Sequence, residues 1–364
     1  MSNLNLKQAL VASIESQDAA IQHLRVLLDG REERAVNYLA LGEEVSVGQK
    51  VVVNTTAVDL ALGSGGVHFV LPRAAQLDWG WGHQMKLRYT PLQLRVNCAE
   101  EQDSPWHRLF TQDCRLNGPV LAAELHSMLP PLALAIKALD AKARIVYIHT
   151  DGGALPAAFS RNITRLKKLG VISQVITSGH SFGGDLETVN IFTGLQAAAQ
   201  VAGADYIIAA MGPGIAGTGT KYGFSGLEQG FLLQGVRALG GVPVQVPRIG
   251  FIDSRNRHRG ISHHTLTVLT KAYAGSVFLP LPLLRQPRRR ILAHQVEQLP
   301  QRCRAHWRDG SFINPISREH PQLFSSMGRN FQENPDFFLA LGAAARLAVE
   351  VYRSKPFPKR IAIK

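Results

Sequence analysis

Short apolar runs alternate with longer amphipathic segments through the second half of the chain. The runs that predict β-strands are RIVYI, SQVIT, DYIIAA, PVQVPRIGF and SVFLPLP. The helical patterns between them begin near Ala154, Asp185, Gly226 and Ser262. In such a repeat each helix must carry the chain back over a face of the sheet, so the strands run parallel. We therefore predict an α/β domain with a mainly parallel sheet over residues 118–284.

In the first 97 residues, short strand-like runs follow one another with only turns between them, which is typical of an all-β domain. The runs HLRVLL and REERAVNYL flank Asp29-Gly30, a dipeptide typical of two-residue hairpins because both turn positions need a positive φ. QKVVVN, GVHFVL, MKLRY and LQLRV follow, separated by glycine-rich turns. Their spacing predicts a small all-β domain, a barrel or a sandwich, over residues 1–97.

The segments around these two domains have their own patterns. Residues 98–117 are polar and irregular, which predicts a linker. The stretch from Gly118 to Leu139 is typical of a helix with a break at Pro130-Pro131. Residues 285–364 form a basic stretch that ends in an amphipathic helix, Asn334 to Tyr352, which should pack on the α/β domain.

Composition places the protein among soluble globular proteins. The chain has 364 residues, of which 45% are hydrophobic, enough for two buried cores. Met1 to Gln17 lacks the basic start and unbroken apolar run of a signal peptide, and no stretch is apolar enough to span a bilayer. Three widely spaced cysteines fit a reducing compartment. We expect a cytoplasmic protein without membrane contact. The sequence is compatible with a homo-oligomer and does not decide the oligomeric state.

A net charge of +13 favours an anionic partner. The basic residues gather in two places: Arg255, Arg257 and Arg259, and then Arg285, Arg288, Arg289, Arg290, Arg302, Arg304, Lys359, Arg360 and Lys364. A phosphorylated small molecule and a nucleic acid bound by the basic tail are both compatible with this charge. The basic runs lack the interleaved aromatic residues of a groove for single-stranded nucleic acid.

Several motifs resemble one known family over nearly the whole chain. They are NYLALGEEVSVGQKVVVNTTAV, GSGGVHFV, HTDGGALPAAFS, GHSFGGDLETVN, MGPGIAGTGTKYGFSGLEQG, HRGISHHT and MGRNFQENPDFFLALGAAA. Together they resemble an uncharacterised bacterial family catalogued as a domain of unknown function. The resemblance implies no activity, cofactor or catalytic residue, so the chemistry has to be argued from the residues.

A glycine-rich loop follows the predicted strand DYIIAA. Its candidate ligand-binding residues are Gly212, Gly214, Gly217, Thr218, Thr220 and Lys221. Glycines let backbone N–H groups approach an oxyanion, while the threonine hydroxyls and the lysine add donors and charge. The loop matches neither a Walker loop nor a Rossmann fingerprint, so a plain connecting loop is the alternative.

The turn Gly179-His-Ser181-Phe-Gly183 fits the G-x-S-x-G pattern of a nucleophile elbow. In this interpretation SQVIT precedes the turn, Asp185 caps the helix after it, and Ser181 attacks the substrate. A triad could be completed downstream by Asp205 or Asp253 with His258, His263 or His264. The carboxylate of Asp185 argues against the pattern, because it would oppose a developing oxyanion nearby.

The third candidate is the stretch from Arg255 to His264. Ser262 is a good helix N-cap, which places His263 and His264 in the first helical turn. The arginines beside them, Arg255 and Arg257, and the imidazole of His258 favour a phosphate or carboxylate ligand. The histidines could instead bind a metal ion with His149, Asp151, His180 or Asp185. Because adjacent helical side chains point about a quarter-turn apart, we predict no metal site.

Loops at the carboxyl ends of parallel strands converge on one crevice, so these candidates should meet there. Our leading hypothesis is an enzyme or binding protein for a phosphorylated or otherwise anionic small molecule, held by the glycine-rich loop and the Arg255 to His264 loop. Asp151, His180 and Asp185 are the acid–base candidates, because neighbouring charges can tune their pKa. The alternatives are a serine hydrolase that uses Ser181 and a non-catalytic nucleic-acid-binding protein. The motifs leave the cofactor unknown.

Overall fold

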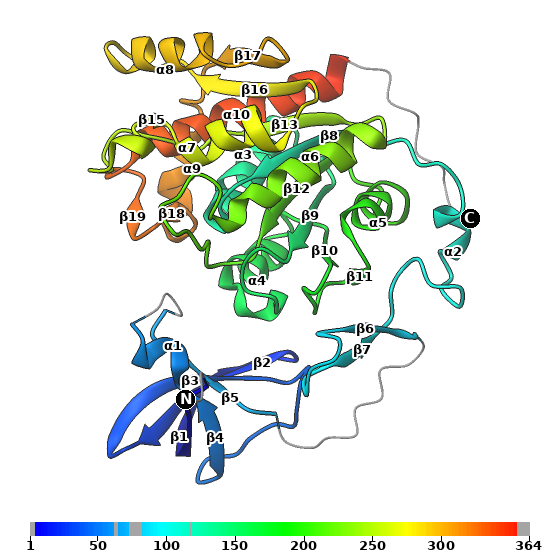
Figure 1. Ribbon diagram of the computed structural model, residues 1–364, viewed down its shortest axis with the longest axis vertical. Helices are drawn as coiled ribbons and strands as arrows, with labels where there is room; N and C mark the ends of the chain where they lie inside the picture. The colour runs from blue at the N-terminus through cyan, green and yellow to red at the C-terminus, as the bar shows by residue number, and fades with distance from the viewer. Residues whose placement is uncertain (1–3, 62–64, 73–81, 117, 355–364) are drawn as a thin grey trace. The chain divides into compact units, whose positions relative to one another are not determined.

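The computed structural model describes residues 4–61, 65–72, 82–116 and 118–354 (Figure 1). The chain divides into two compact units, Met1–Asn97 and Cys98–Lys364. Each unit has its own hydrophobic core, and the two are described separately below.

The first unit contains a closed β-barrel. Its strands are β1 (Leu6–Gln17), β2 (Ile21–Leu28), β3 (Arg31–Tyr38), β4 (Lys50–Asn54) and β5 (His68–Val70), in the order β1-β2-β3-β5-β4. Asp29 and Gly30 have φ values of 50° and 79°, which confirms the hairpin predicted between β2 and β3. The helix α1 (Thr56–Asp59) and a separate hairpin of β6 (Gln84–Lys86) and β7 (Leu94–Val96) complete this unit. The all-β prediction is confirmed, as a barrel rather than a sandwich.

The second unit is built on an eight-stranded sheet whose strands all run parallel. The strand order is β11-β10-β9-β12-β8-β13-β16-β17. The strands span β8 (Pro119–Ala123), β9 (Ile145–Thr150), β10 (Gln174–Ser178), β11 (Leu186–Thr188), β12 (Tyr206–Met211), β13 (Val242–Val246), β16 (Val277–Pro282) and β17 (Cys303–Arg308). This arrangement confirms the predicted α/β fold.

Helices cover both faces of this sheet (Figure 1). The core of one face includes residues of α3 (Leu129–Leu139), α4 (Arg161–Lys168), α9 (Ile313–Glu319) and α10 (Pro335–Ser354). The core of the other face includes residues of α5 (Ile191–Gln196), α6 (Gln229–Ala238), α8 (Arg288–Glu297) and the turn that continues α7 (His263–Thr267). Successive residues of β9 alternate between these cores, with Tyr147 in the first and Ile148 in the second. The predicted C-terminal helix is α10, which packs on the sheet as expected.

Three sequence predictions were wrong in detail. Gly118 to Leu139 is not helical throughout, because residues 119–123 form the buried strand β8 and the helix α3 begins only at Leu129. Asp185 does not cap a helix: it precedes the short strand β11, and α5 begins after Asn190, whose side chain caps it. The basic stretch after residue 285 contains two further helices, α8 and α9, and one more strand of the sheet, β17.

The segment 98–117, where we expected a linker, lies within the second unit. It holds a short helix, α2 (His107–Phe110). Cys98, Ala99 and Leu116 are buried, and the N–H of Ala99 donates to the carbonyl of Glu187. This part of the chain is therefore packed against the α/β unit.

Candidate functional site

The connections of the sheet diverge at the carboxyl end of β8. The chain leaves β8 toward α3 on one face, whereas it leaves the neighbouring strands β12 and β13 toward α6 and α7 on the other face (Figure 1). Ligands of open α/β sheets bind where consecutive connections part in this way. The residues just beyond β8, β12 and β13 therefore define the candidate site.

Glu124, the residue directly after β8, forms the centre of a buried polar network. Its carboxylate accepts hydrogen bonds from His264 Nδ1 at 2.7 Å and Thr265 Oγ1 at 3.3 Å, and it pairs with Arg248 Nη1 at 3.4 Å. Burial alone would raise the pKa of Glu124, but the hydrogen bond from His264 and the charge of Arg248 outweigh burial and lower it. The site thus contains a buried carboxylate that is ionised at neutral pH.

Three histidine rings gather beside this carboxylate. Ser262 caps α7 by accepting from the N–H of His264, as predicted, and its hydroxyl also bonds His258 Nδ1 at 2.9 Å. The ring centroid of His263 lies 4.3 Å from that of His264 and 5.0 Å from that of His258. Burial is the main cause of the pKa shifts of two of these rings. It lowers the pKa of His263, and it lowers the pKa of His258 to about 4. His258 and His263 are therefore neutral at neutral pH, with lone pairs for a ligand.

The glycine-rich loop reaches this cluster, as the convergence argument predicts. Gly217 pairs with Phe224 in an antiparallel bridge, and the ring of Phe224 stacks on that of His264 with centroids 4.1 Å apart. A Cβ placed on Gly219 would lie 3.9 Å from Nη2 of Arg257. The loops around residues 212–221 and 255–264 therefore lie together at the carboxyl edge of the sheet.

Several residues of the glycine-rich loop, which we predicted to bind a ligand, instead contact other groups of the protein. The hydroxyls of Thr218 and Thr220 lie 2.9 Å apart, and Thr218 also donates to the carbonyl of Gly223. Lys221 is exposed, with its ammonium over the ring of Tyr222. The backbone of Gly212 packs tightly, because a Cβ there would come 2.1 Å from the carbonyl oxygen of Ala154. Gly214 has a φ of 94°, a conformation that favours glycine.

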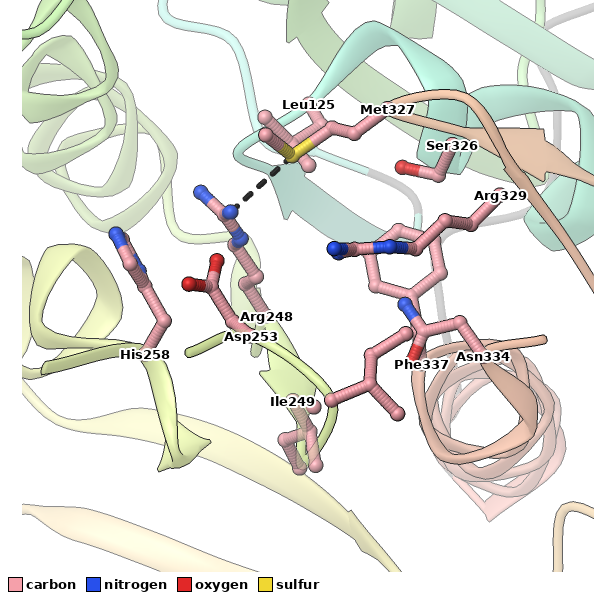
Figure 2. A pocket seen from close by; sticks show the side chains of 12 residues that line it. Leu125, Arg248, Ile249, Asp253, His258, Ser326, Met327, Arg329, Asn334 and Phe337 are labelled. Carbon is pink, nitrogen blue, oxygen red and sulfur yellow. Dashed lines mark hydrogen bonds between the residues drawn. The ribbon is translucent and has the colours of Figure 1, made fainter. Parts of the chain in front are cut away.

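A pocket adjoins the network on the side of β13. Short hairpins, β14 (Ile249–Gly250) with β15 (Gly260–Ile261) and β18 (Ser325–Ser326) with β19 (Arg329–Asn330), contribute to its walls. Its polar lining includes Arg248, Asp253, His258, Ser326, Arg329 and Asn334 (Figure 2). Arg255 points its guanidinium at Asp253, with nitrogen–oxygen distances of 2.9 and 2.8 Å, and this contact holds the pKa of Asp253 far below its usual range.

Ser181 and Asp185 lie elsewhere, beside the outer strands β10 and β11. The hydroxyl of Ser181 is fully buried and donates to the carbonyl of Thr150 at 2.8 Å. Asp185 accepts from the N–H of Val175 at 2.8 Å and pairs with Lys167. A nucleophile elbow needs a strand, a turn and then a helix, whereas the strand β11 follows this turn. Both side chains hold the turn in place, and the geometry does not favour the hydrolase interpretation.

Asp151, the residue after β9, lies near a second carboxylate, that of Glu228 in the turn Ser225–Glu228. One of the oxygens of Asp151 accepts from the N–H of His180 at 3.1 Å. Nearby, Glu228 accepts a hydrogen bond from the hydroxyl of Thr150. Burial, and to a lesser extent the charge of Asp151, raise the pKa of Glu228 to about 7. Glu228 can therefore both donate and accept a proton near neutral pH.

Sequence reasoning missed five of the polar residues at this edge of the sheet. They are Glu124, His126, Glu228, Arg248 and Arg329. His126 is buried, bonds Ser160 Oγ at 2.6 Å, and has its pKa lowered to about 3, mainly by burial. Glu124 and His126 follow β8, the strand that we predicted to be helical, so the argument from strand ends could not reach them.

Many basic residues of the C-terminal stretch have partners in the fold. Arg288 pairs with Asp336 at 2.8 Å, Arg302 donates to the carbonyls of Leu269 and Tyr273, and Arg289 lies over the ring of Trp307. Lys359, Arg360 and Lys364 lie outside the described residues. In the part of the chain that the structure describes, no helix has the length and apolar character needed to cross a membrane.

Comparison with known proteins places the chain in one family. The family described as "Protein of unknown function (DUF3866)" matches residues 34–345, a span that takes in parts of both units. The chain therefore belongs to this family, which confirms the resemblance in its sequence motifs. No curated protein and no solved structure matches it.

Proposed function

We propose that this protein binds, and acts as an enzyme on, a phosphorylated or otherwise anionic small molecule at the carboxyl edge of its eight-stranded sheet. The observation that carries the proposal is the pair of arginines, Arg248 and Arg329, that line one pocket (Figure 2). Guanidinium groups donate in a fixed fork that matches the oxygens of phosphate and carboxylate.

The charges around the pocket favour an anion. Among the described residues its lining contains one carboxylate, Asp253, which Arg255 already neutralises. Arg248 shares the charge of Glu124, whereas Arg329 has no ion-pair partner within the described ranges. The half-buried guanidinium of Arg329 is therefore left to attract an anion in a recess partly shielded from water.

Acid–base groups lie next to the same loops. Glu228 belongs to the 3₁₀ turn Ser225–Glu228, and a Cβ on Gly226 in that turn would come 3.2 Å from Cγ of Glu124. With a pKa of about 7, Glu228 suits general acid–base catalysis, with Asp151 and His180 beside it. We assign proton transfer to Glu228 and anion binding to Arg329. The glycine-rich loop and Arg257 would then form the edge of the binding site.

Thermal unfolding in the presence of matched ligand pairs tests this proposal. Glucose 6-phosphate is compared with glucose, AMP with adenosine, and inorganic phosphate with chloride at constant ionic strength. A phosphorylated compound should raise the midpoint by about 2 °C or more, because a ligand that prefers the folded state stabilises it by mass action. Its neutral counterpart should not.

The variant Arg329→Gln should lose most of this shift. Arg318→Gln, which removes an exposed arginine from α9, is the matched control and should respond like the parent. An Arg329→Gln protein that keeps the full response, or a parent that responds to none of the phosphorylated compounds, would contradict the proposal.

A further inference from the structure

We infer that His258, His263 and His264 form a binding site for one divalent transition-metal ion, with Zn²⁺ as the best fit. Each ring offers one nitrogen, and these three atoms all lie within 4.8 Å of one another. The inference goes beyond the anion pocket and does not rest on it. It also departs from our sequence-based expectation that adjacent histidines on a helix do not share an ion.

The surroundings of the histidines resemble the outer shell of a metal site. A metal-binding histidine usually donates its second N–H to a carboxylate, a carbonyl or a hydroxyl, which fixes the ring and its tautomer. His264 makes this contact with Glu124 at 2.7 Å, and His258 makes it with Ser262 at 2.9 Å. In both rings the contact uses Nδ1 and directs Nε2 away from the partner.

His263 supplies the third and most informative nitrogen. Its Nε2 is buried and has no hydrogen-bond partner among the residues that the structure describes. A buried polar atom without a partner costs about 1–3 kcal/mol, so such atoms are rare unless a water, an ion or a ligand satisfies them. An ion shared with the two neighbouring rings would satisfy this nitrogen.

The geometry requires only a small adjustment. Nitrogen ligands about 2.1 Å from a tetrahedral ion lie about 3.4 Å apart. The present separations of up to 4.8 Å therefore close with side-chain shifts of about an ångström. Although residues 263 and 264 are adjacent on α7, their ring centroids are only 4.3 Å apart. Their rotamers have already brought the two rings together, so the quarter-turn between them does not prevent a shared ion.

The donor set and the nearby charge select the type of ion. Three imidazoles favour Zn²⁺, Co²⁺ or Ni²⁺, whereas Mg²⁺ and Ca²⁺ prefer oxygen ligands. The carboxylate of Glu124, which contacts His264, offsets part of the charge of the ion, even though Arg248 shares that carboxylate. Three protein ligands leave a fourth position for an oxygen of water or of a bound anion. His258 also lines the anion pocket, so the two sites meet at this side chain.

Metal titration of the full-length protein without a histidine tag tests the inference. After treatment with EDTA and its removal, Zn²⁺ is titrated in competition with a chromogenic chelator. We expect one ion per chain, bound with a dissociation constant of about a micromolar or lower. Co²⁺ in place of Zn²⁺ should produce the visible absorption of a tetrahedral site with nitrogen ligands.

His263→Gln is the most informative variant, because His263 is only partly buried and its Nε2 has no hydrogen bond, among the described residues, that the substitution would remove. It should weaken Zn²⁺ binding by at least about 100-fold, more than the loss of an outer partner costs. His294→Ala, on the exposed face of α8, is the control and should bind like the parent. Unchanged circular dichroism and thermal midpoint of each metal-free variant establish that it is folded.

Two outcomes would overturn the metal site. One is a parent protein that binds no Zn²⁺ at 10 µM or so, and the other is His263→Gln binding Zn²⁺ as tightly as the parent. Stabilisation of the chelator-treated protein by phosphate is measured in parallel. That response reports on the anion pocket alone, so failure of the metal site and failure of the proposed function can be distinguished.

Discussion

Glu124 and His264 are separated by 140 positions in the chain and joined by a hydrogen bond of 2.7 Å. The bond connects the end of the central strand β8 with the first turn of α7. Arg248, which follows β13, pairs with the same carboxylate. One buried negative charge therefore holds together the end of β8, the segment after β13 and the start of α7.

Replacing this carboxylate by an amide should destabilise the fold. In Glu124→Gln the shape and one acceptor remain, but the guanidinium of Arg248 is left without its counter-charge in a buried position. We expect the free energy of unfolding at neutral pH to fall by about 2–4 kcal/mol, which urea denaturation measures. Glu319→Gln, an exposed residue of α9, is the control. Equal stability of the two variants would mean that the network contributes little.

The sequence could predict that the loops converge, but it could not predict that Glu124 lies at the centre of the site. Alternating strand and helix patterns predict a parallel sheet, and a parallel sheet brings the loops after its strands to one edge. This argument correctly joins the loop at Gly219 to the loop at Arg257. Ser262 was also identified as the cap of α7 from its residue type alone.

The missed strand β8 shows where such reasoning ends. Residues 119–123, PVLAA, are all buried, so they lack the alternation of apolar and polar residues that marks a half-buried strand. A short apolar run of this kind, with two alanines and a leucine, is equally compatible with a buried helix. Glu124 then looks like one carboxylate on a helix, and its role becomes visible only when His264 is placed beside it.

The turn at Ser181 illustrates the opposite error, in which a motif matched but its context did not. Asp185 has the residue type of a helix cap, yet its carboxylate binds the N–H of Val175 in the preceding strand. The true cap is Asn190, five positions after Asp185, and it forms a capping box with Thr193. Local residue type could not decide between Asp185 and Asn190, because pairing of β10 with β11 determines which residue is available.

A fluorophosphonate probe should leave the native protein unlabelled at Ser181. The hydroxyl is fully buried and donates a hydrogen bond to the carbonyl of Thr150, whereas the hydroxyl of a serine nucleophile must donate to a general base that can take its proton. Labelling is measured by mass spectrometry beside a known serine hydrolase as positive control. Labelling of the parent protein that Ser181→Ala abolishes would restore the hydrolase interpretation.

Gly212→Ala should be far more damaging than Gly217→Ala in the same loop. The Cβ of an alanine at 212 would lie 2.1 Å from the carbonyl oxygen of Ala154 and 2.5 Å from Nε2 of His149. At 217 the nearest atom is 3.7 Å away, an ordinary contact. We expect a loss of about 1–3 kcal/mol or more for Gly212→Ala and a change within about 0.5 kcal/mol for Gly217→Ala, measured by urea denaturation. Similar losses at both positions would show that the loop as a whole, and not this close approach, limits stability.

Glu228 should make the protein less stable as the pH rises toward neutrality. Its carboxyl has an ordinary pKa of 4.5 when exposed and a pKa of about 7 in the fold, mainly because of burial. Between these values the folded state keeps a proton that the unfolded chain has released. The free energy of unfolding therefore decreases as the pH rises from 4.5 to about 7, and this contribution is constant above that pH.

Glu228→Gln should remove this dependence, because an amide keeps the hydrogen bond from Thr150 and does not titrate. Relative to the parent, the variant should gain stability between pH 4.5 and pH 8, by on the order of 2 kcal/mol. Urea denaturation of both proteins across this range gives the difference directly, and Glu319→Gln controls for the loss of one negative charge. If the difference between Glu228→Gln and the parent is the same at pH 4.5 and pH 8, the carboxyl does not titrate near neutrality. Glu228 would then be unable to serve as the acid–base group of the proposed enzyme.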